Sequence, residues 1–341
     1  MRNHKKRLLF CLLLGIIFAL GLTSYWIFYT KFSSSIDHAF VYIDKDDNID
    51  SVYTKLEKVA QPQQMIGFKI LAKTMEYEQA IKTGKYEVGD RLTTVELINN
   101  LRNKVQVPVR LMVPSARTMD KLAARLAKGI APDSAELMQC FQDTALCAQF
   151  GHTVATISCI FIPNTYEVYW DITPEQLMKR MKKECDHFWN EERKEKAQQQ
   201  GLTLLEVMTL ASIVDRETAN DGEKPSIAGL YLNRLRKGML LQADPTVIYA
   251  NQQFGLRRVR QKHLKIDSPY NTYVYKGLPP GPIAIPAIAS IDAVLNAEKN
   301  NYLYMCAKED FSGTHNFASS YAQHLRNARK YTRALNKRGI K

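Results

Sequence analysis

The sequence has few of the patterns that mark metal, nucleotide or disulfide chemistry. Its seven histidines lack a paired metal-ligand spacing, and it has no glycine-rich phosphate-binding loop. We therefore expect no metal site and no cofactor. No Cys-x-x-Cys pair occurs among the six cysteines. Oxidising surroundings would permit a bridge within residues 140–159, but the sequence leaves the pairing open for Cys140, Cys147, Cys159, Cys185 and Cys306.

The N-terminal residues predict a membrane anchor. An uncharged run over residues 8–30 is long enough to span a bilayer as a helix. Aromatic residues such as Tyr25 and Trp26 stand where a cleaved signal peptide usually has small ones, so we expect an uncleaved anchor. Basic side chains in residues 1–7 place that tail in the cytoplasm and the rest outside a plasma (inner) membrane, as a single-pass protein: Arg2, Lys5, Lys6 and Arg7.

The net charge of +13 does not predict a nucleic-acid partner. Part of it lies in the N-terminal tail and part in residues 326–341. The densest internal group suits anionic lipid headgroups or anionic cell-wall polymer: Arg257, Arg258, Arg260, Lys262 and Lys265.

A short β-rich run followed by an amphipathic helix recurs three times after residue 39. The strands are expected at 40–43, 86–88 and 109–113, and Thr93 with Glu96 forms a capping box before the second helix. Such units occur in glycan-binding modules and as ordinary packing units. Since 341 residues with 45% apolar and 24% charged side chains can bury one or two cores, the mixture predicts an α+β fold.

One carboxylate stands at the end of an unusually apolar helical pattern over residues 204–218. Leu210, Ile213 and Glu217 share one side of that helix, so the Glu217 carboxylate is directed at packed material. Desolvation raises the pKa of a carboxyl group toward neutrality, where it can act as a general acid. The plainer alternative is an ion pair between Glu217 and Arg216 at a frayed helix end.

Four later segments could build a cleft around Glu217. Pro245 disfavours helix at Asp244, which could cap a helix beginning at Pro245, and Gln242 with Thr246 could bind sugar hydroxyls. Residues 270–273 (Tyr-Asn-Thr-Tyr) offer either a stacking face or an edge strand. The proline-rich loop 277–283 suits a cleft wall or a plain connection. His315 follows Gly313 in an expected turn, where a lone histidine is more often structural than catalytic.

Together these segments resemble the MltG-type endolytic murein transglycosylases, the YceG-like family. The resemblance rests on Ala-Ser-Ile-Val-Asp-Arg-Glu-Thr at 211–218, Asn-Arg-Leu at 233–235, Leu-Gln-Ala-Asp-Pro-Thr-Val at 241–247, and the segments 270–273, 277–283 and 315–317. It covers nearly the whole chain. The chain departs from the family in having Asp215 where Glu is usual, Ser158-Cys159 where Glu-Gly is usual, and Asn164 where Asp is usual.

The resemblance implies residue roles. Glu217 would be catalytic, while Ser212, Asp215, Asn233 and Arg234 would support it. Substrate binding would fall to Gln242, Asp244, Thr246, Tyr270, Asn271, Thr272, Tyr273, Pro280 and His315. It also implies four parts: a cytoplasmic tail (1–7), an anchor (8–30), a small LysM-like β/α subdomain (36–108) and a mixed α+β catalytic domain (109–341).

The implied activity is cleavage within glycan strands of peptidoglycan, between N-acetylmuramic acid and N-acetylglucosamine. Ordinary glycosidases use two carboxylates, but a lytic transglycosylase needs one, because the muramyl 6-hydroxyl attacks and leaves a 1,6-anhydro end. Such an enzyme would terminate glycan elongation, with peptidoglycan synthases (penicillin-binding proteins) as partners. The alternative is a membrane-anchored, non-catalytic peptidoglycan-binding scaffold, which would not require Glu217.

Overall fold

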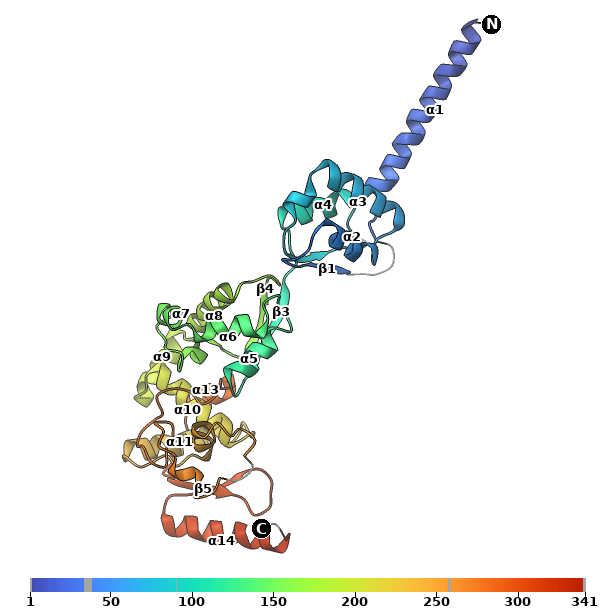
Figure 1. Ribbon diagram of the computed structural model, residues 1–341. Coiled ribbons are helices and arrows are strands. Elements are labelled where there is room, and N and C mark those ends of the chain that lie inside the picture. The colour runs from blue at the N-terminus through green and yellow to red at the C-terminus, as the bar shows by residue number, and fades with distance from the viewer. Residues whose placement is uncertain (1, 34–38, 90, 257–258, 340–341) are drawn as a thin grey trace. The chain divides into compact units, whose positions relative to one another are not determined.

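The computed structural model describes residues 2–33, 39–89, 91–256 and 259–339 and shows helices with three small sheets (Figure 1). This confirms the predicted α+β class. Arg257 and Arg258 of the predicted basic group, the start of the predicted 36–108 subdomain and the ends of the chain lie outside the described residues, as does the Arg2 side chain. The chain forms two compact units.

The first unit comprises Met1–Leu111 with the later segments Gly129–Ala131 and Glu167–Ile172. Its first helix, α1 (Arg2–Phe28), contains the stretch His4–Phe28, which is long and apolar enough to cross a membrane. The Asp171 carboxylate ties one later segment to this unit. It accepts hydrogen bonds from Thr83 Oγ1 at 2.8 Å and Gln106 Nε2 at 2.9 Å.

The core of the first unit lies between helices and one antiparallel sheet. Strand β1 (Phe40–Ile43) pairs with β2 (Gly84–Glu87), which begins two residues before the predicted strand. The helices are α2 (Ile49–Glu57), α3 (Pro62–Thr74), the 3₁₀ helix η1 (Tyr77–Ala80) and α4 (Thr94–Asn103). The predicted capping box of Thr93 and Glu96 is confirmed at the start of α4. Phe32, Phe68 and Tyr86 are fully buried in this core.

The second unit begins with a helical layer. A short sheet is formed by strands β3 (Val109–Val113) and β4 (Asn164–Val168), of which residues 109–111 and 167–168 are assigned to the first unit. Helices α5 (Met119–Leu126), α6 (Ser134–Gln142), α7 (Thr144–Gln149) and the 3₁₀ helix η2 (Ile157–Ile160) lie between them in sequence. All six cysteines belong to the described residues and are free thiols, so the bridge considered within residues 140–159 is absent.

The charged segment from Pro174 to Gln200 forms two helices. They are α8 (Pro174–Phe188) and α9 (Glu191–Gln200). The helix breaks because the Asn190 side chain caps α9, accepting a hydrogen bond from the Arg193 amide at 3.0 Å. Side-chain capping of this kind competes with continuation of the preceding helix.

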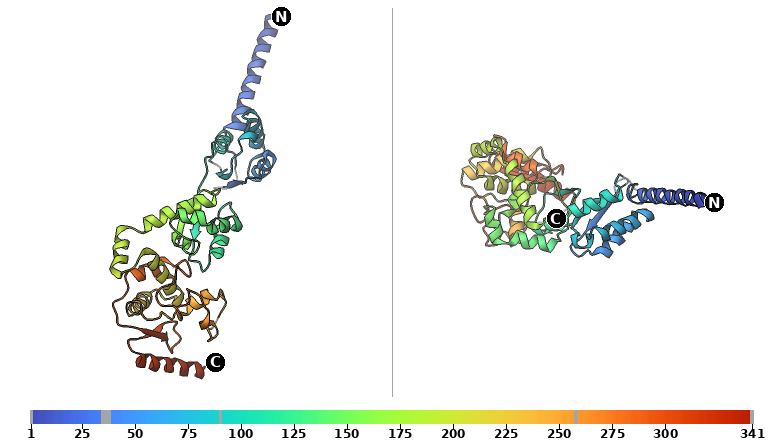
Figure 2. Two further views of the ribbon diagram at one scale, coloured as in Figure 1. Left: turned by 60° about the vertical axis from the view of Figure 1, so that its left-hand side comes forward. Right: turned by 90° about the horizontal axis from the view of Figure 1, so that it is seen from above.

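The remaining elements carry the candidate site (Figure 2). Helix α10 (Leu204–Glu217) is buried along most of its length, as predicted, and packs on α11 (Lys224–Arg236) and α13 (Ile288–Leu295). Helix α12 (Asp244–Ala250) and the 3₁₀ helix η3 (His263–Lys265) lie between them in sequence. Strands β5 (Tyr304–Ala307) and β6 (His315–Ala318) pair antiparallel, and α14 (Tyr321–Lys337) packs beside them.

A glycine on α11 allows one close backbone approach in this packing. A Cβ atom at Gly229 would lie 2.3 Å from the Glu298 carbonyl oxygen. The adjoining segment is held to α11 by Asn233 Nδ2, which donates to the Asn300 carbonyl at 2.9 Å. Alanine ordinarily favours a helix over glycine by about 1 kcal/mol, but here the backbone clash opposes it.

We expect Gly229→Ala to lower the free energy of unfolding by about 1–3 kcal/mol, because the segment around Glu298 must shift. Urea unfolding followed by tryptophan fluorescence would measure the change. Gly255→Ala is the matched control, since a Cβ there meets no atom within 4 Å and the backbone is not left-handed. Equal stability of Gly229→Ala and the wild type would contradict the close approach.

Candidate active site

Glu217 is the last residue of α10 and lines a pocket of about 220 Å³. Its side chain is half-buried, and Tyr231 Oη on α11 donates a hydrogen bond to Glu217 Oε1 at 2.7 Å. The helix ends here because Thr218 adopts an extended conformation. The pocket is lined by Glu217, Leu230, Tyr231, Arg234, Leu241, Gln242, Asp244, Tyr273, Met305, Cys306, Ala307 and His315.

Burial raises the pKa of the Glu217 carboxyl to about 7, and the Asp244 charge acts in the same direction. The hydrogen bond from Tyr231 and the Arg234 charge oppose this rise. The alternative of an ion pair with Arg216 is not what the structure shows, because the Arg216 guanidinium contacts Asp215. A carboxyl group with this pKa can both donate and accept a proton near neutral pH.

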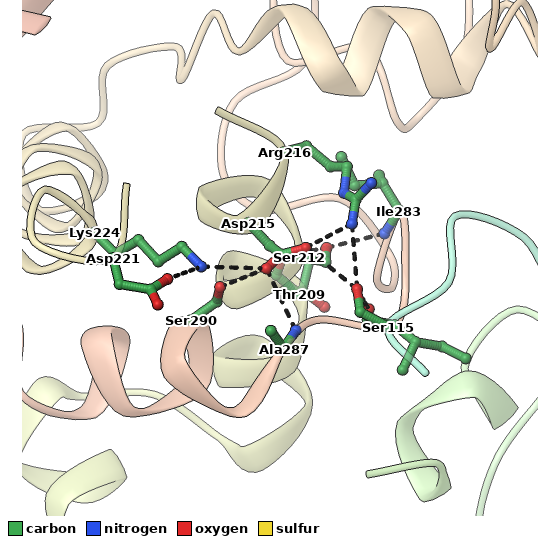
Figure 3. Close-up of polar contacts among 11 residues, drawn as sticks. Ser115, Thr209, Ser212, Asp215, Arg216, Asp221, Lys224, Ile283, Ala287 and Ser290 are labelled. Atoms are coloured by element: carbon green, nitrogen blue, oxygen red, sulfur yellow. Dashed lines mark hydrogen bonds and ion pairs between the residues drawn. The ribbon is translucent and has the colours of Figure 1, made fainter. Parts of the chain in front are cut away.

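Asp215 is surrounded by hydrogen-bond donors and cations (Figure 3). Its Oδ1 accepts a hydrogen bond from Ser290 Oγ at 2.7 Å, and its Oδ2 accepts one from Arg216 Nη2 at 2.6 Å. Lys224 Nζ lies 3.5 Å away. Burial would raise the pKa of Asp215, but the hydrogen bonds from Ser290 and Arg216 and the charges of Arg216 and Lys224 outweigh it, so the pKa is lowered. Asp215 is therefore ionised at neutral pH.

Ser212 fastens the proline-rich segment to α10. Its Oγ donates to the Thr209 carbonyl at 2.7 Å and accepts from the Ile283 amide at 3.0 Å (Figure 3). Pro280, in the same segment, is exposed and does not line the pocket. The predicted supporting residue Ser212 thus acts on the backbone around the site.

Several predicted binding residues do reach the pocket. Gln242 has a left-handed backbone (φ 51°), and its backbone N–H donates to the Thr272 carbonyl at 3.0 Å. Asp244 is the first residue of α12 rather than the cap before it, and Tyr273 Oη donates to its Oδ1 at 2.6 Å. His315, expected in a turn, begins β6, and its amide donates to Glu223 Oε1 at 2.7 Å.

The two predicted supporting residues on α11 connect the pocket to the C-terminal hairpin. Arg234 lines the pocket, and its Nε donates to the Leu303 carbonyl at 2.6 Å while its Nη1 donates to the Leu241 carbonyl at the same distance. Asn233 bonds instead to the Tyr302 carbonyl at 3.1 Å. These contacts hold β5 and the 241–244 segment against α11.

Four other predicted binding residues contact only the protein itself. Thr246 and Thr272 are buried with their hydroxyl oxygens 2.8 Å apart. Asn271 Nδ2 donates to the carbonyls of Leu264 and Ile266. Tyr270 packs against Tyr249 with ring centroids 4.7 Å apart. None of these four side chains lines the Glu217 pocket, and the 270–273 segment forms turns rather than an edge strand.

The sequence patterns do not single out four residues that take part in the bonding around the site: Tyr231, Glu223, Lys224 and Ser290. One signal for Tyr231 was present: it stands three residues before Arg234, so both fall on one face of α11. Lys224 and Ser290 give no comparable signal, because their partner Asp215 lies on a different helix. Among the described residues, no group of three or more His, Cys, Asp or Glu side chains could hold a metal ion.

Comparison with known proteins gives matches over most of the chain. The model of the YceG-like family matches residues 41–330. The chain is 36% identical to the endolytic murein transglycosylase of Bacillus subtilis (strain 168) over 168 residues, which cover 49% of this chain and 46% of that protein. It is 25% identical to the endolytic murein transglycosylase of Streptococcus pneumoniae serotype 2 over 334 residues, covering 88% of this chain and 59% of that protein.

A crystal structure of a yceG-like protein of Listeria monocytogenes is also similar. It aligns with a TM-score of 0.56 at 26% identity and covers 86% of this chain and 99% of the other. By contrast, the chain spans about half the length of the curated relatives it matches, 46% and 59% of the two described above.

Glu217→Gln tests the raised pKa through stability. The folded state holds the Glu217 proton more tightly, because the pKa is about 7 against an ordinary 4.5. The resulting stabilisation is complete below pH 4.5 and is lost as the pH rises through 7. We expect the stability of the wild type relative to Glu217→Gln to fall by on the order of 3 kcal/mol across this window.

Urea unfolding of both proteins at several pH values measures that difference. Asp215→Asn serves as a control with the opposite sign: its lowered pKa means that the wild type gains stability over this variant as the pH rises from the acid range. If the difference in unfolding free energy between the wild type and Glu217→Gln stays constant from pH 4 to 8, the pKa of Glu217 is not raised.

Proposed function

The chain belongs to the YceG-like family, and on that premise we propose that it is an endolytic lytic transglycosylase of peptidoglycan with Glu217 as its catalytic residue. The name shared by the Bacillus and Streptococcus relatives supports the activity and the substrate class. The observation that carries the catalytic assignment is the Glu217 carboxyl itself, whose pKa is raised to about 7 by burial in a pocket.

The reaction needs one group that first donates and then accepts a proton. In the proposed mechanism, Glu217 protonates the oxygen of the MurNAc–GlcNAc bond, and the bond between that oxygen and the muramyl C1 breaks. The muramyl 6-hydroxyl then attacks C1 and returns its proton to Glu217, leaving a 1,6-anhydro end. Asp244, the other carboxylate of the pocket, would favour the protonated form of Glu217 and stabilise positive charge at C1.

The remaining pocket groups would orient the sugar. Gln242, Tyr273 and His315 line the pocket and offer an amide, a phenol and an imidazole. Because Thr246, Asn271 and Thr272 bond within the protein, we assign them the role of fixing the 241–247 and 263–273 segments. Tyr270 and Pro280 do not line this pocket, so they would contact only parts of the glycan strand that lie away from Glu217.

Helix α1 would anchor the protein as a single pass in the plasma (inner) membrane, with residues 1–7 in the cytoplasm and the enzyme outside. Residues 36–108 would form a LysM-like glycan-binding subdomain, and the 109–341 region the catalytic domain. Termination of glycan elongation beside peptidoglycan synthases would follow from this placement.

Product analysis separates this proposal from its alternatives. We expect full-length wild type in detergent to release 1,6-anhydromuramyl ends from purified peptidoglycan, as read by mass spectrometry, and Glu217→Gln to release at least about a hundredfold fewer. Reducing ends without anhydro ends would instead indicate hydrolysis with Asp244 as the second carboxylate. Undiminished release by Glu217→Gln, or no release by either protein, would favour the non-catalytic scaffold.

Tyr231→Phe tests how the pocket sets the working pH. Since the hydrogen bond from Tyr231 lowers the pKa of Glu217, its loss should raise that pKa. We expect the alkaline limb of the kcat/KM profile to move to higher pH by about one unit. Tyr273→Phe removes a hydroxyl from the same pocket that contacts Asp244 instead, and the limb should move less with it. Identical profiles for wild type and Tyr231→Phe would contradict the role of this bond.

A further inference from the structure

Helix α14 (Tyr321–Lys337) carries a narrow line of cations. Its sequence contains no Asp or Glu, and its basic residues recur at spacings of three, four and seven. At ~100° per residue, they fall within an arc of about 100° on one side of the helix, and the first and last are about 16 Å apart along the axis. All are exposed: Arg326, Arg329, Lys330, Arg333 and Lys337.

The opposite side of α14 is already occupied. Tyr321 and His324 lie against Tyr304 on β5, with ring centroids 5.7 and 5.4 Å from it, and Tyr331 lies 5.8 Å from Phe311. At ~100° per residue, these rings project roughly 130–170° away from the centre of the basic arc. The contacts with the hairpin therefore leave the basic line on the side of α14 away from β5. Figure 1 shows α14 beside β5 with no other element drawn against its far side.

The cations of this line are largely unneutralised. Lys330 lies close enough to Glu309 to interact with it electrostatically. Within the part of the chain that the structure describes, no ion pair joins Arg326, Arg329, Arg333 or Lys337 to an acid. Some exposed lysines on other helices differ in this respect, since Lys69 on α3 pairs with Glu57 and Lys194 on α9 pairs with Glu191. Unpaired like charges in one row repel each other unless an anion lies between them.

We propose that this line on α14 binds a linear, phosphate-bearing polymer, separately from the Glu217 pocket. Such a chain can follow a row of cations and release its condensed counterions, which favours binding at low salt. A bilayer surface fits less well. Helices that bind membranes insert apolar side chains, whereas those of α14 face β5 and β6, and Tyr321 at one end is its only strongly exposed large hydrophobic residue among those described.

The test uses full-length protein in phosphatidylcholine nanodiscs, titrated with fluorescent inorganic polyphosphate. We expect Arg329→Gln/Arg333→Gln to bind at least about tenfold more weakly, and the slope of log Kd against log salt to fall by about one per lost contact. Lys179→Gln/Lys183→Gln is the matched control: it removes two exposed cations at the same i,i+4 spacing on α8 and should bind like the wild type.

Two further results decide the matter. Glu217→Gln should bind polyphosphate like the wild type, so a failed catalytic assignment would leave this proposal standing. Equal losses in the α14 variant and the α8 control, or no polyphosphate binding by the wild type, would overturn it. A membrane contact would be shown instead by two results with phosphatidylglycerol vesicles. The vesicles would displace polyphosphate from the wild type at equal phosphate concentration, and they would lose this ability with Arg329→Gln/Arg333→Gln.

Discussion

The set of bonds around Asp215 is the constraint on which the candidate site depends. Asp215 draws together α10, the residues at the start of α13 and the Lys224 end of α11. Because it pairs with Arg216 and approaches Lys224, the charges of these two cations are directed to Asp215 and not to Glu217. At ~100° per residue, Asp215 and Glu217 point about 200° apart on the helix. One carboxylate therefore holds the end of α10 while the other lines the pocket.

The pocket is assembled from segments that are distant in sequence, and buried polar bonds hold them in place. Arg234 ties the Leu303 carbonyl and the Leu241 carbonyl to α11. Thr246 and Thr272 bond to each other and so join the segments that carry Gln242 and Tyr273. A buried hydroxyl or amide without a partner costs about 1–3 kcal/mol, so these groups must be paired with one another. Polar residues in a family motif can thus be structural even when a sugar-binding role is equally consistent with their chemistry.

Local signals in the sequence predicted much of the fold and one essential part of the site. Apolar periodicity located α10, the capping residues located the start of α4, and the helix side placed Glu217 toward packed material, because each depends only on neighbours in sequence. The partners of Glu217 and His315 depend on tertiary packing instead. Tyr231 comes from the next helix, and Glu223 is 92 residues from His315. Likewise, nothing local indicates that Thr246 turns inward rather than toward a ligand.

The Glu217 carboxylate has no ion-pair partner among the described residues, although Arg234 lines the same pocket and its charge lowers the Glu217 pKa less than burial raises it. A cation within ion-pair distance of Glu217 would lower the pKa of its carboxyl further and favour the ionised form, which has no proton to donate. The pocket offers a phenol instead: Tyr231 orients the carboxyl by a hydrogen bond but brings no full charge. Gln242 adds a left-handed backbone that non-glycine residues rarely adopt. The pocket therefore combines an unfavourable backbone conformation at Gln242 with a desolvated Glu217 carboxyl, which can still carry a proton at neutral pH.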